Sequence, residues 1–269
     1  ARAAEILALS KVGGSKAIVH AAAGQDWDAL VQSTIDADLV GLECLSGIPG
    51  FVGATPIQNV GAYGQEISNV LTEVDVLDRV SLRQTTFDAQ SCEFTYRDSR
   101  FKSRDRDRYI VTRATYRLEA SARPQIRYPE LERQIVEAHI DLDRLAGRGA
   151  AQAVRDVVLD LRRSKAMVVD PDDANTRSAG SFFLNPILSQ DEYEQTCACW
   201  RAFAGEAVPA IPSYPNAESS GGHKVPAAWL VERAGFVRGT TQQGAGVSER
   251  HALALVSHSG CERDLSALA

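Results

Sequence analysis

Residues 41–64 read GLECLSGIPGFVGATPIQNVGAYG and hold six glycines, two prolines and one charged side chain, Glu43. Glycine and proline at this density interrupt helices and strands, yet the segment is too apolar for a solvated linker. Glycine permits positive φ angles and close approach, which makes backbone N–H groups accessible to a ligand. The pattern therefore predicts a loop that wraps closely around something flat or charged.

The elements around this segment follow from hydrophobic periodicity. Residues 17–23 form a short apolar strand, and Asp26 is the expected N-cap of a helix. The buried face of that helix is expected to hold Trp27, Leu30, Val31, Thr34 and Ile35. Alternation predicts strands at 70–77 and 110–118, the latter with the even-numbered residues from Ile110 to Leu118 on one face and a wet face opposite.

Three helices and a domain boundary are predicted in the second half of the chain. A polar break at 121–129 is a candidate domain boundary. Helices are predicted at 150–163, 191–203 and 227–234, with Gly235 at the C′ position of the last. Residues 263–269 begin an amphipathic helix that stops after about two turns, so the chain is expected to be cut at its C-terminus, and its start also looks abrupt.

Composition narrows the class of protein. The 269 residues suffice for one large or two ordinary domains, and 44% hydrophobic with 24% charged residues is typical of a soluble globular protein. A net charge of −6 argues against a protein dominated by nucleic-acid contacts. No apolar run of about 18 residues is present, so no transmembrane helix is expected. The five scattered cysteines predict free thiols in a reducing cytoplasm, with neither a disulfide framework nor a metal site.

Four further motifs carry a family resemblance. They are FTYRDSRFK (94–102), SAGSFFLNP (178–186), AAWLVERAGF (227–236) and GAGVSERHALALVSHSG (244–260). Together with residues 41–64, and in this order, they resemble the UDP-N-acetylenolpyruvoylglucosamine reductases (MurB). The resemblance runs from about residue 24 to residue 264.

The resemblance implies an α+β fold. It comprises a partial FAD-binding domain of the PCMH/vanillyl-alcohol-oxidase type at 1–122, a linker at 123–149 and a substrate-binding domain at 150–269. The implied function is NADPH-dependent, FAD-mediated reduction of UDP-N-acetylglucosamine enolpyruvate to UDP-N-acetylmuramate in peptidoglycan biosynthesis. A cytoplasmic monomer without nucleic-acid or membrane partners is expected.

The Gly-rich segment is the part that lines FAD in this family. Its backbone can supply N–H groups to the flavin and pyrophosphate without Cβ clashes. The cofactor-binding residues that the resemblance implies are Gly47, Ile48, Pro49, Gly50, Gly53, Ala54, Gln58, Asn59, Gly61, Ala62 and Gly64. Without the other motifs, a purely structural loop would be the preferred interpretation.

Two residues are implied as catalytic. Arg97 matches the arginine near the flavin and the substrate carboxylate, where a guanidinium can stabilise charge that develops during hydride addition. Ser181 matches the general acid that protonates C2, which a serine can do if the acceptor is a strongly basic enolate. From sequence alone, a surface arginine, like its neighbours Arg100, Arg104 and Arg106, and a turn-capping serine are the alternatives.

Substrate contacts are implied at Tyr63, Tyr128, Lys165, Asn185, Tyr214 and Lys224. The lysines are candidates for the UDP pyrophosphate, with solvated side chains as the alternative. Tyr128 resembles a tyrosine whose loop closes over the nucleotide in one subgroup of the family. His251 is expected to be structural.

Two family elements are missing from the chain. The family's pyrophosphate loop would precede residue 1, and residues 13–16 (GGSK) are interpreted as an ordinary hairpin turn. The family's catalytic glutamate would follow residue 269. Weak FAD binding and poor catalysis are therefore expected, and a degenerate, non-catalytic nucleotide-sugar or flavin-binding protein remains an alternative, as does another flavin oxidoreductase of the same FAD-domain fold.

Overall fold

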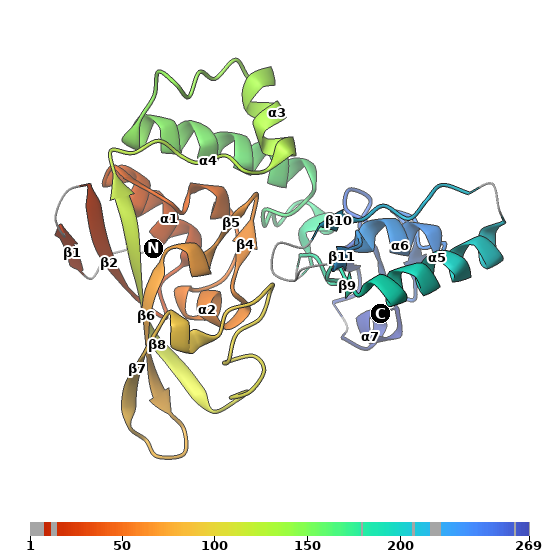
Figure 1. The fold of residues 1–269 in the computed structure, drawn as a ribbon, viewed down its shortest axis with the longest axis horizontal. Coiled ribbons are helices and arrows are strands. Elements are labelled where there is room, and N and C mark those ends of the chain that lie inside the picture. Colours follow the sequence, from red (N-terminus) through yellow and green to blue (C-terminus); the bar gives the residue numbers. More distant parts are fainter. Residues whose placement is uncertain are drawn as a thin grey trace. The chain divides into compact units, whose positions relative to one another are not determined.

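The computed structural model describes residues 8–11, 15–178, 180–205, 208–215, 222–260 and 262–268. The chain divides into two compact units, Ala1–Arg163 and Ser164–Ala269 (Figure 1). Residues 13 and 14 of the predicted GGSK turn lie outside the described residues. Mixed helices and strands in both units confirm the predicted α+β class.

The first unit is built on one six-stranded sheet and a separate two-stranded hairpin. Its strands are β1 (Ala8–Lys11), β2 (Lys16–Ala22), β3 (Leu39–Val40), β4 (Gly61–Ala62), β5 (Gln65–Glu66), β6 (Leu71–Asp78), β7 (Gln84–Asp88) and β8 (Tyr109–Ala120). Its helices are α1 (Trp27–Asp36), α2 (Thr55–Gln58), α3 (Pro129–Glu137) and α4 (Gly147–Ser164), with short 3₁₀ turns η1 (Glu43–Leu45), η2 (Val52–Ala54), η3 (Ile67–Asn69) and η4 (Gln90–Cys92). The sheet order is β1-β2-β8-β6-β7, with β3 beside β8 and β4–β5 as a separate hairpin.

Every pairing in this sheet is antiparallel, and the predicted strands appear as β2, β6 and β8. The predicted face of β8 is wrong at its start, because the register with β6 shifts between Asp75 and Val76. The shift leaves Thr112 out of the pairing, so Val111 is buried while Ile110 is 50% exposed.

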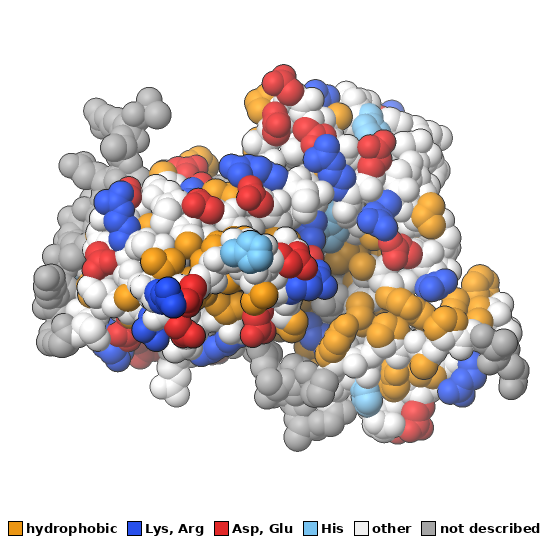
Figure 2. All heavy atoms as spheres, turned by 90° about the horizontal axis from the view of Figure 1, so that it is seen from above, with side chains coloured by type: hydrophobic (Ala, Val, Ile, Leu, Met, Phe, Trp, Pro, Cys, Tyr) orange, Lys and Arg blue, Asp and Glu red, His pale blue; other side chains and the backbone are white. Residues whose placement is uncertain are grey.

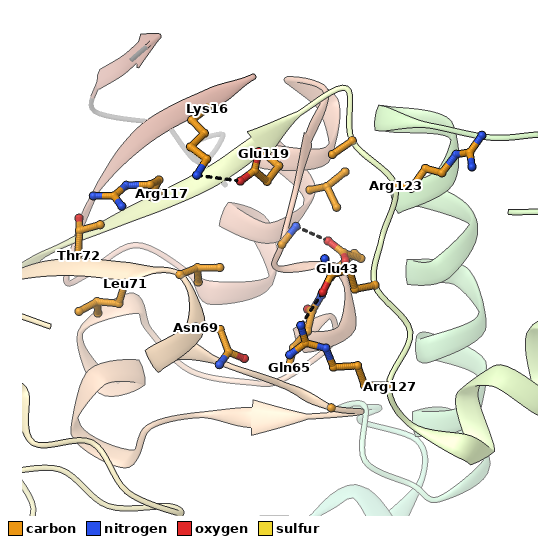
Figure 3. Close-up of a pocket in the computed structure, with 16 residues that line it drawn as sticks. Lys16, Glu43, Gln65, Asn69, Leu71, Thr72, Arg117, Glu119, Arg123 and Arg127 are labelled. Carbon is orange, nitrogen blue, oxygen red and sulfur yellow. Dashed lines mark hydrogen bonds and ion pairs between the residues drawn. The ribbon is translucent and has the colours of Figure 1, made fainter. Parts of the chain in front are cut away.

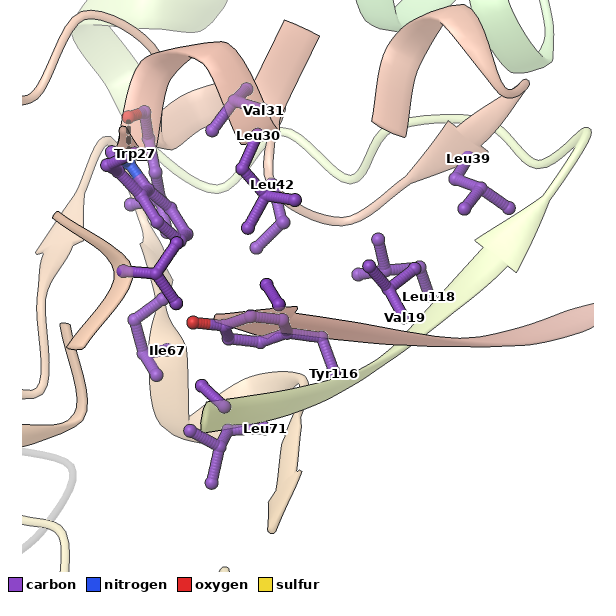
Figure 4. Packing of buried hydrophobic residues seen from close by; sticks show 14 of the residues in the cluster. Val19, Trp27, Leu30, Val31, Leu39, Leu42, Ile67, Leu71, Tyr116 and Leu118 are labelled. Atoms are coloured by element: carbon purple, nitrogen blue, oxygen red, sulfur yellow. Dashed lines mark hydrogen bonds between the residues drawn. The ribbon is translucent and has the colours of Figure 1, made fainter. Parts of the chain in front are cut away.

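The core between α1 and the sheet confirms the predicted helix face (Figure 4). The Asp26 side chain accepts a hydrogen bond from the Ala29 N–H at 2.9 Å and so caps the helix. Trp27 packs edge-on against Tyr116 of β8, with ring centroids 6.1 Å apart, and donates its indole N–H to the Leu45 carbonyl at 3.0 Å. This contact fixes the start of the Gly-rich segment against the core.

A second cluster explains where the first unit ends. The apolar face of α4, with Val154, Val158 and Leu161, packs with Leu131 of α3 and with Cys44. Helix α4 therefore belongs with the first unit, and the division between the units falls after Arg163. The predicted start of the second domain at residue 150 differs from this division, because the cluster that buries α4 is contributed by residues far away in sequence.

The charged run at 97–108 is mostly surface, as predicted, but Arg100 is not. Its side chain is only 12% exposed, pairs with Asp105 at 2.6 Å and lies over the Phe87 ring at 4.0 Å. Arg104 and Arg106 are 55% and 79% exposed and confirm the prediction. The interpretation of Arg100 as a surface residue is therefore wrong, because Phe87 offers an aromatic face that sequence does not reveal.

The second unit has two small sheets and three helices among its described residues. Its elements are η5 (Ala174–Thr176), β9 (Ile187–Leu188), α5 (Gln190–Ala204), β10 (Tyr214–Pro215), β11 (His223–Lys224), α6 (Ala227–Arg233), β12 (Thr241–Gln242), β13 (Ala245–Val247), β14 (Leu255–Ser257) and α7 (Glu262–Leu268). The sheet orders are β10-β11-β9 and β12-β13-β14. The predicted helices appear as α5, α6 and α7, and Gly235 ends α6 at φ 97°.

Within the described parts of the chain, no helix is both long and apolar enough to cross a membrane. On the face drawn in Figure 2, basic and acidic side chains are interspersed.

Candidate functional site

The Gly-rich segment folds around the N-terminus of α1. The Gly50 carbonyl accepts from the Trp27 N–H at 2.9 Å, and the Gly47 N–H donates to Asp28 Oδ1 at 2.6 Å. Arg155 of α4 donates to the two oxygens of the same carboxylate from both terminal nitrogens, at 2.6 and 2.7 Å. The turn at 47–50 is thus anchored to two helices of the first unit.

The Asp28 carboxylate is held in its charged form. Burial by itself would raise its pKa, but the hydrogen bonds from Arg155 and from the Gly47 N–H, together with the charges of Arg155 and Arg162, bring the pKa below its ordinary value. A fixed negative charge behind the turn therefore orients the Gly47 peptide. This support came from outside the Gly-rich segment, and the sequence analysis did not identify it.

The turn leaves two N–H groups for a ligand. Among the described residues, no acceptor is bonded to the N–H of Ile48 or of Gly50. Gly47 and Gly50 have φ of 70° and 110°, and no atom lies within 4 Å of a Cβ placed on Gly50. Beside the turn, the buried Gln25 carboxamide has no hydrogen-bond partner among the described residues. The open backbone at 47–50 fits the close approach that a flavin nucleotide needs.

Other N–H groups that the sequence offered to FAD are already engaged. The Gly47 N–H bonds to Asp28, the Gly53 N–H to the Ala23 carbonyl at 2.9 Å, and the Ala54 N–H to the Phe51 carbonyl at 3.0 Å. A Cβ on Gly53 would lie 2.7 Å from the Cβ of Ala23. In this structure these three N–H groups are therefore not available to a ligand, and Gly53 is needed for its close packing against Ala23.

The remaining predicted cofactor residues are placed as follows. Pro49 is exposed, Gln58 ends α2, Ala62 ends β4, and Gly64 (φ 81°) is the second residue of the β4–β5 turn. Asn59, with φ 46°, is the C-cap residue of α2 and is buried.

Arg97 is fixed against the Gly-rich segment. Its Nη1 donates to Glu66 Oε1 at 3.0 Å and its Nη2 donates to the Gly61 carbonyl at 2.5 Å. A Cβ on Gly61 would lie 2.5 Å from Arg97 Nη1, so glycine is required for this approach. Asn59 donates to the second oxygen of Glu66 at 3.2 Å. Arg97 is therefore not a loose surface residue, and three of its five N–H groups have no partner among the described residues.

Tyr63 and Tyr128 are brought together, as two predicted substrate residues of the first unit. Their rings meet edge-on with centroids 5.5 Å apart. Tyr63 has φ 48°, a conformation that is uncommon for an aromatic residue, at the first position of the β4–β5 turn. Burial raises the pKa of its hydroxyl to about 12. Tyr128 is 40% exposed and stands at the N-cap of α3.

In the second unit, Ser181 lies beside a histidine. Ser181 and Ala254 form an isolated antiparallel β-bridge, and the Phe182 N–H donates to the Leu253 carbonyl at 2.8 Å. This pairing brings Ser181 Oγ to 3.4 Å from His251 Nε2. No local sequence signal pairs these two residues, although both stand in motifs that carry the family resemblance.

The other predicted substrate residues of the second unit lie on β10 and β11, before α6 and in the turn after α4. Tyr214 and Lys224 face each other across β10 and β11, and Lys224 also pairs with Ile187 of β9. Asn185 accepts from the Ala227 N–H at 2.9 Å and thereby caps α6. Lys165 is half-buried in the turn after α4.

A pocket of ≈ 560 Å³ lies elsewhere on the first unit (Figure 3). Four cationic side chains line it, namely Lys16, Arg117, Arg123 and Arg127. Of the predicted cofactor residues only Gly64 lines it, so the turn at 47–50 and Arg97 lie outside this pocket. Among the described residues, no cluster of histidine, cysteine and carboxylate side chains could hold a metal ion.

Two family models match the chain, one within each of its two units. Residues 170–269 match the family described as UDP-N-acetylenolpyruvoylglucosamine reductase, C-terminal domain, and residues 5–81 match an FAD binding domain. A crystal structure of the reductase (MurB) from Thermus caldophilus resembles the chain with a TM-score of 0.58 at 20% identity, over 93% of this chain and 65% of that one. This likeness supports the fold.

The curated relatives are closer in sequence. The UDP-N-acetylenolpyruvoylglucosamine reductase of Thermobifida fusca is 47% identical over 98% of this chain and 71% of its own length. Those of Streptomyces avermitilis and Mycobacterium avium are 43% and 42% identical, over 93% and 92% of this chain and 67% and 65% of their own lengths. With these identities and both domain matches, the chain belongs to the UDP-N-acetylenolpyruvoylglucosamine reductase family of FAD-dependent oxidoreductases.

Proposed function

We propose that this chain reduces UDP-N-acetylglucosamine enolpyruvate to UDP-N-acetylmuramate, with FAD as cofactor and NADPH as hydride donor. The chemistry that FAD supplies when bound is the transfer of hydride from NADPH to C3 of the enolpyruvyl group. The protein is proposed to act as a monomer in the cytoplasm, where NADPH and the nucleotide sugar are both present.

The observation that carries the proposal is the fixed guanidinium of Arg97 against the Gly-rich segment. Hydride addition at C3 pushes negative charge onto C2 and its carboxylate. A guanidinium remains charged and can pair with a carboxylate through two N–H groups. Because Glu66 and Gly61 hold Arg97 from one side, its remaining N–H groups are preorganised for that charge.

The backbone at 47–50 is proposed to bind FAD. The N–H groups of Ile48 and Gly50 can donate to an anionic or carbonyl oxygen of the cofactor. Gly50→Ala would place a Cβ on this surface and would strain a residue at φ 110°. We expect weaker FAD binding, measured as flavin fluorescence during titration. Gly24→Ala, at an exposed glycine with open space around it, is the matched control.

Ser181 is proposed to donate the proton to C2. As the C2–H bond forms, the Ser181 O–H bond breaks, and the serine recovers its proton from solvent.

Tyr214 and Lys224, which face each other across β10 and β11, are proposed to contact the nucleotide sugar, together with Asn185 and Lys165. In the first unit, the Tyr63–Tyr128 pair is the proposed contact.

The test uses the FAD-reconstituted chain with NADPH and the enolpyruvyl substrate, and product is measured by mass spectrometry. Arg97→Met is expected to lower kcat about 10²- to 10³-fold, the effect of removing a preorganised donor. Arg106→Met, in the same charged run but 79% exposed, should change nothing. Ser181→Ala should lower kcat at least about 10²-fold. Undiminished turnover in Ser181→Ala would overturn the acid assignment, and FAD binding without any turnover in the unsubstituted chain would favour the non-catalytic alternative.

A further inference from the structure

Ser181 and His251 meet through a turn in the second unit. The chain reverses at 251–254, where the Ala254 N–H donates to the His251 carbonyl at 3.1 Å. The Leu253 N–H donates to the Nδ1 atom of the His251 ring at 3.1 Å, so the histidine closes its own turn. The opposite ring nitrogen, Nε2, lies 3.4 Å from Ser181 Oγ.

The hydrogen bond from the Leu253 N–H to Nδ1 determines which ring nitrogen carries the proton. A backbone N–H can only donate, so Nδ1 must accept with its lone pair. A neutral imidazole then carries its hydrogen on Nε2. Protonation of Nδ1 would place two donors face to face and would break the bond that closes the turn. The Nε2–H group is therefore the donor toward Ser181 Oγ.

This direction of the hydrogen bond sets the role of the serine. A histidine that accepts from a serine hydroxyl removes its proton and makes it a nucleophile. Here the histidine donates, so the hydroxyl proton stays on Ser181 and points away from the ring. When that proton leaves, the Nε2–H group faces the alkoxide, and hydrogen bonds to an ionised acceptor are the stronger kind.

We propose that His251 is a positioning residue, whose Nε2–H group orients the Ser181 hydroxyl and stabilises the alkoxide left after proton donation to C2. The inference rests on the proposed function of Ser181 as the proton donor. The proton balance is complete: the Ser181 proton goes to C2, the O–H electron pair stays on Oγ, and water returns the proton after product forms. His251 neither gains nor loses a proton in the step.

The first test needs no turnover. In the ¹⁵N-labelled chain, long-range ¹H–¹⁵N correlation spectra report which ring nitrogen of His251 is protonated. The expected result is the Nε2–H tautomer, with a chemical shift of that proton that changes in Ser181→Ala. An Nδ1–H tautomer, or an Nε2–H signal indifferent to Ser181→Ala, would overturn the inference whether or not the chain is catalytically active.

The second test separates positioning from turn closure. His251→Asn keeps an acceptor for the Leu253 N–H but loses the distant donor, whereas His251→Gln keeps a donor near the Nε2 position and loses the cap. Positioning predicts that kcat falls roughly 10- to 100-fold in His251→Asn, the effect of losing a hydrogen bond to a charged group, with KM little changed. His251→Gln should stay within about fivefold of the unsubstituted chain.

The reverse order of these two variants would mean that the histidine serves only the turn, and the inference would fail. Failure of the proposed function looks different. If Ser181→Ala turned over at an undiminished rate, Ser181 would not be the acid, while the spectra would still report the tautomer of His251.

Discussion

The ion pair between Arg155 and Asp28 holds the Gly-rich turn in place, and its contribution to stability can be measured. Replacing Arg155 with methionine keeps an apolar side chain of similar length on α4 but leaves the Asp28 carboxylate without its partner. Removing one member of a fully buried pair costs about 3–5 kcal/mol. The Arg155 side chain is 9% exposed but that of Asp28 is 35% exposed, so solvent compensates in part, and we expect a loss of about 2–3 kcal/mol.

The neighbouring pair between Arg148 and Asp36 supplies the control. It joins the same two helices at 3.1 Å, but its side chains are 65% and 49% exposed. Arg148→Met should therefore cost less than about 1 kcal/mol. Urea unfolding at pH 7 gives both values. Trp27 is the only tryptophan of the first unit, so a background in which the other two are phenylalanine lets fluorescence follow that unit alone.

The pH dependence adds a second prediction about the same pair. The pKa of Asp28 is lowered in the folded protein, against the effect of burial, mainly by Arg155 and the Gly47 N–H. A lowered carboxyl pKa contributes stability that is present above the unfolded value of about 3.9 and is lost as the pH falls through the folded value. The difference between the unsubstituted chain and Arg155→Met should therefore be constant from about pH 7 to 5 and shrink below about pH 4. Equal losses in Arg155→Met and Arg148→Met at pH 7 would refute the reasoning.

Three further predictions concern the first unit. Gly61→Ala should displace the Arg97 guanidinium and cost about 1–3 kcal/mol in urea unfolding, because its Cβ would lie 2.5 Å from Nη1. Burial raises the pKa of the Cys92 thiol to about 12, so mass spectrometry after thiol labelling at pH 8 should find Cys92 unmodified in the folded chain and the exposed Cys199 modified. Tyr116→Phe should destabilise by about 1 kcal/mol, since the buried hydroxyl bonds to a threonine at 3.0 Å.

Local signals in the sequence were sufficient for the helices. Asp26 before an apolar periodic stretch identified α1 and its buried face, and Gly235 identified the end of α6. These predictions succeeded because capping and periodicity involve residues within one or two turns of each other. The Gly-rich segment was likewise identified as irregular, but not which of its glycines face a ligand.

What failed depended on contacts between distant residues. Arg100 is largely shielded because it contacts Phe87 and Asp105, and Val111 replaces Thr112 on the buried face because β6 and β8 shift register. The Gly53 N–H is used by Ala23 of the preceding loop. None of these partners can be located by spacing along the chain. His251 is the same case, since seventy residues separate it from Ser181.

The two candidate catalytic groups are held in the same manner. Arg97 donates two of its N–H groups to Glu66 and Gly61, and Ser181 Oγ lies 3.4 Å from His251 Nε2, its proposed donor. In each case contacts on one side fix the group, and its remaining donors are the ones proposed to meet the substrate. Donors fixed in this way need little reorganisation when charge develops on the substrate, which is the main source of electrostatic catalysis. In the proposed mechanism Arg97 and Ser181 both act as donors, which suits a reaction that builds negative charge and then quenches it with a proton, and does not suit hydrolysis by an activated serine.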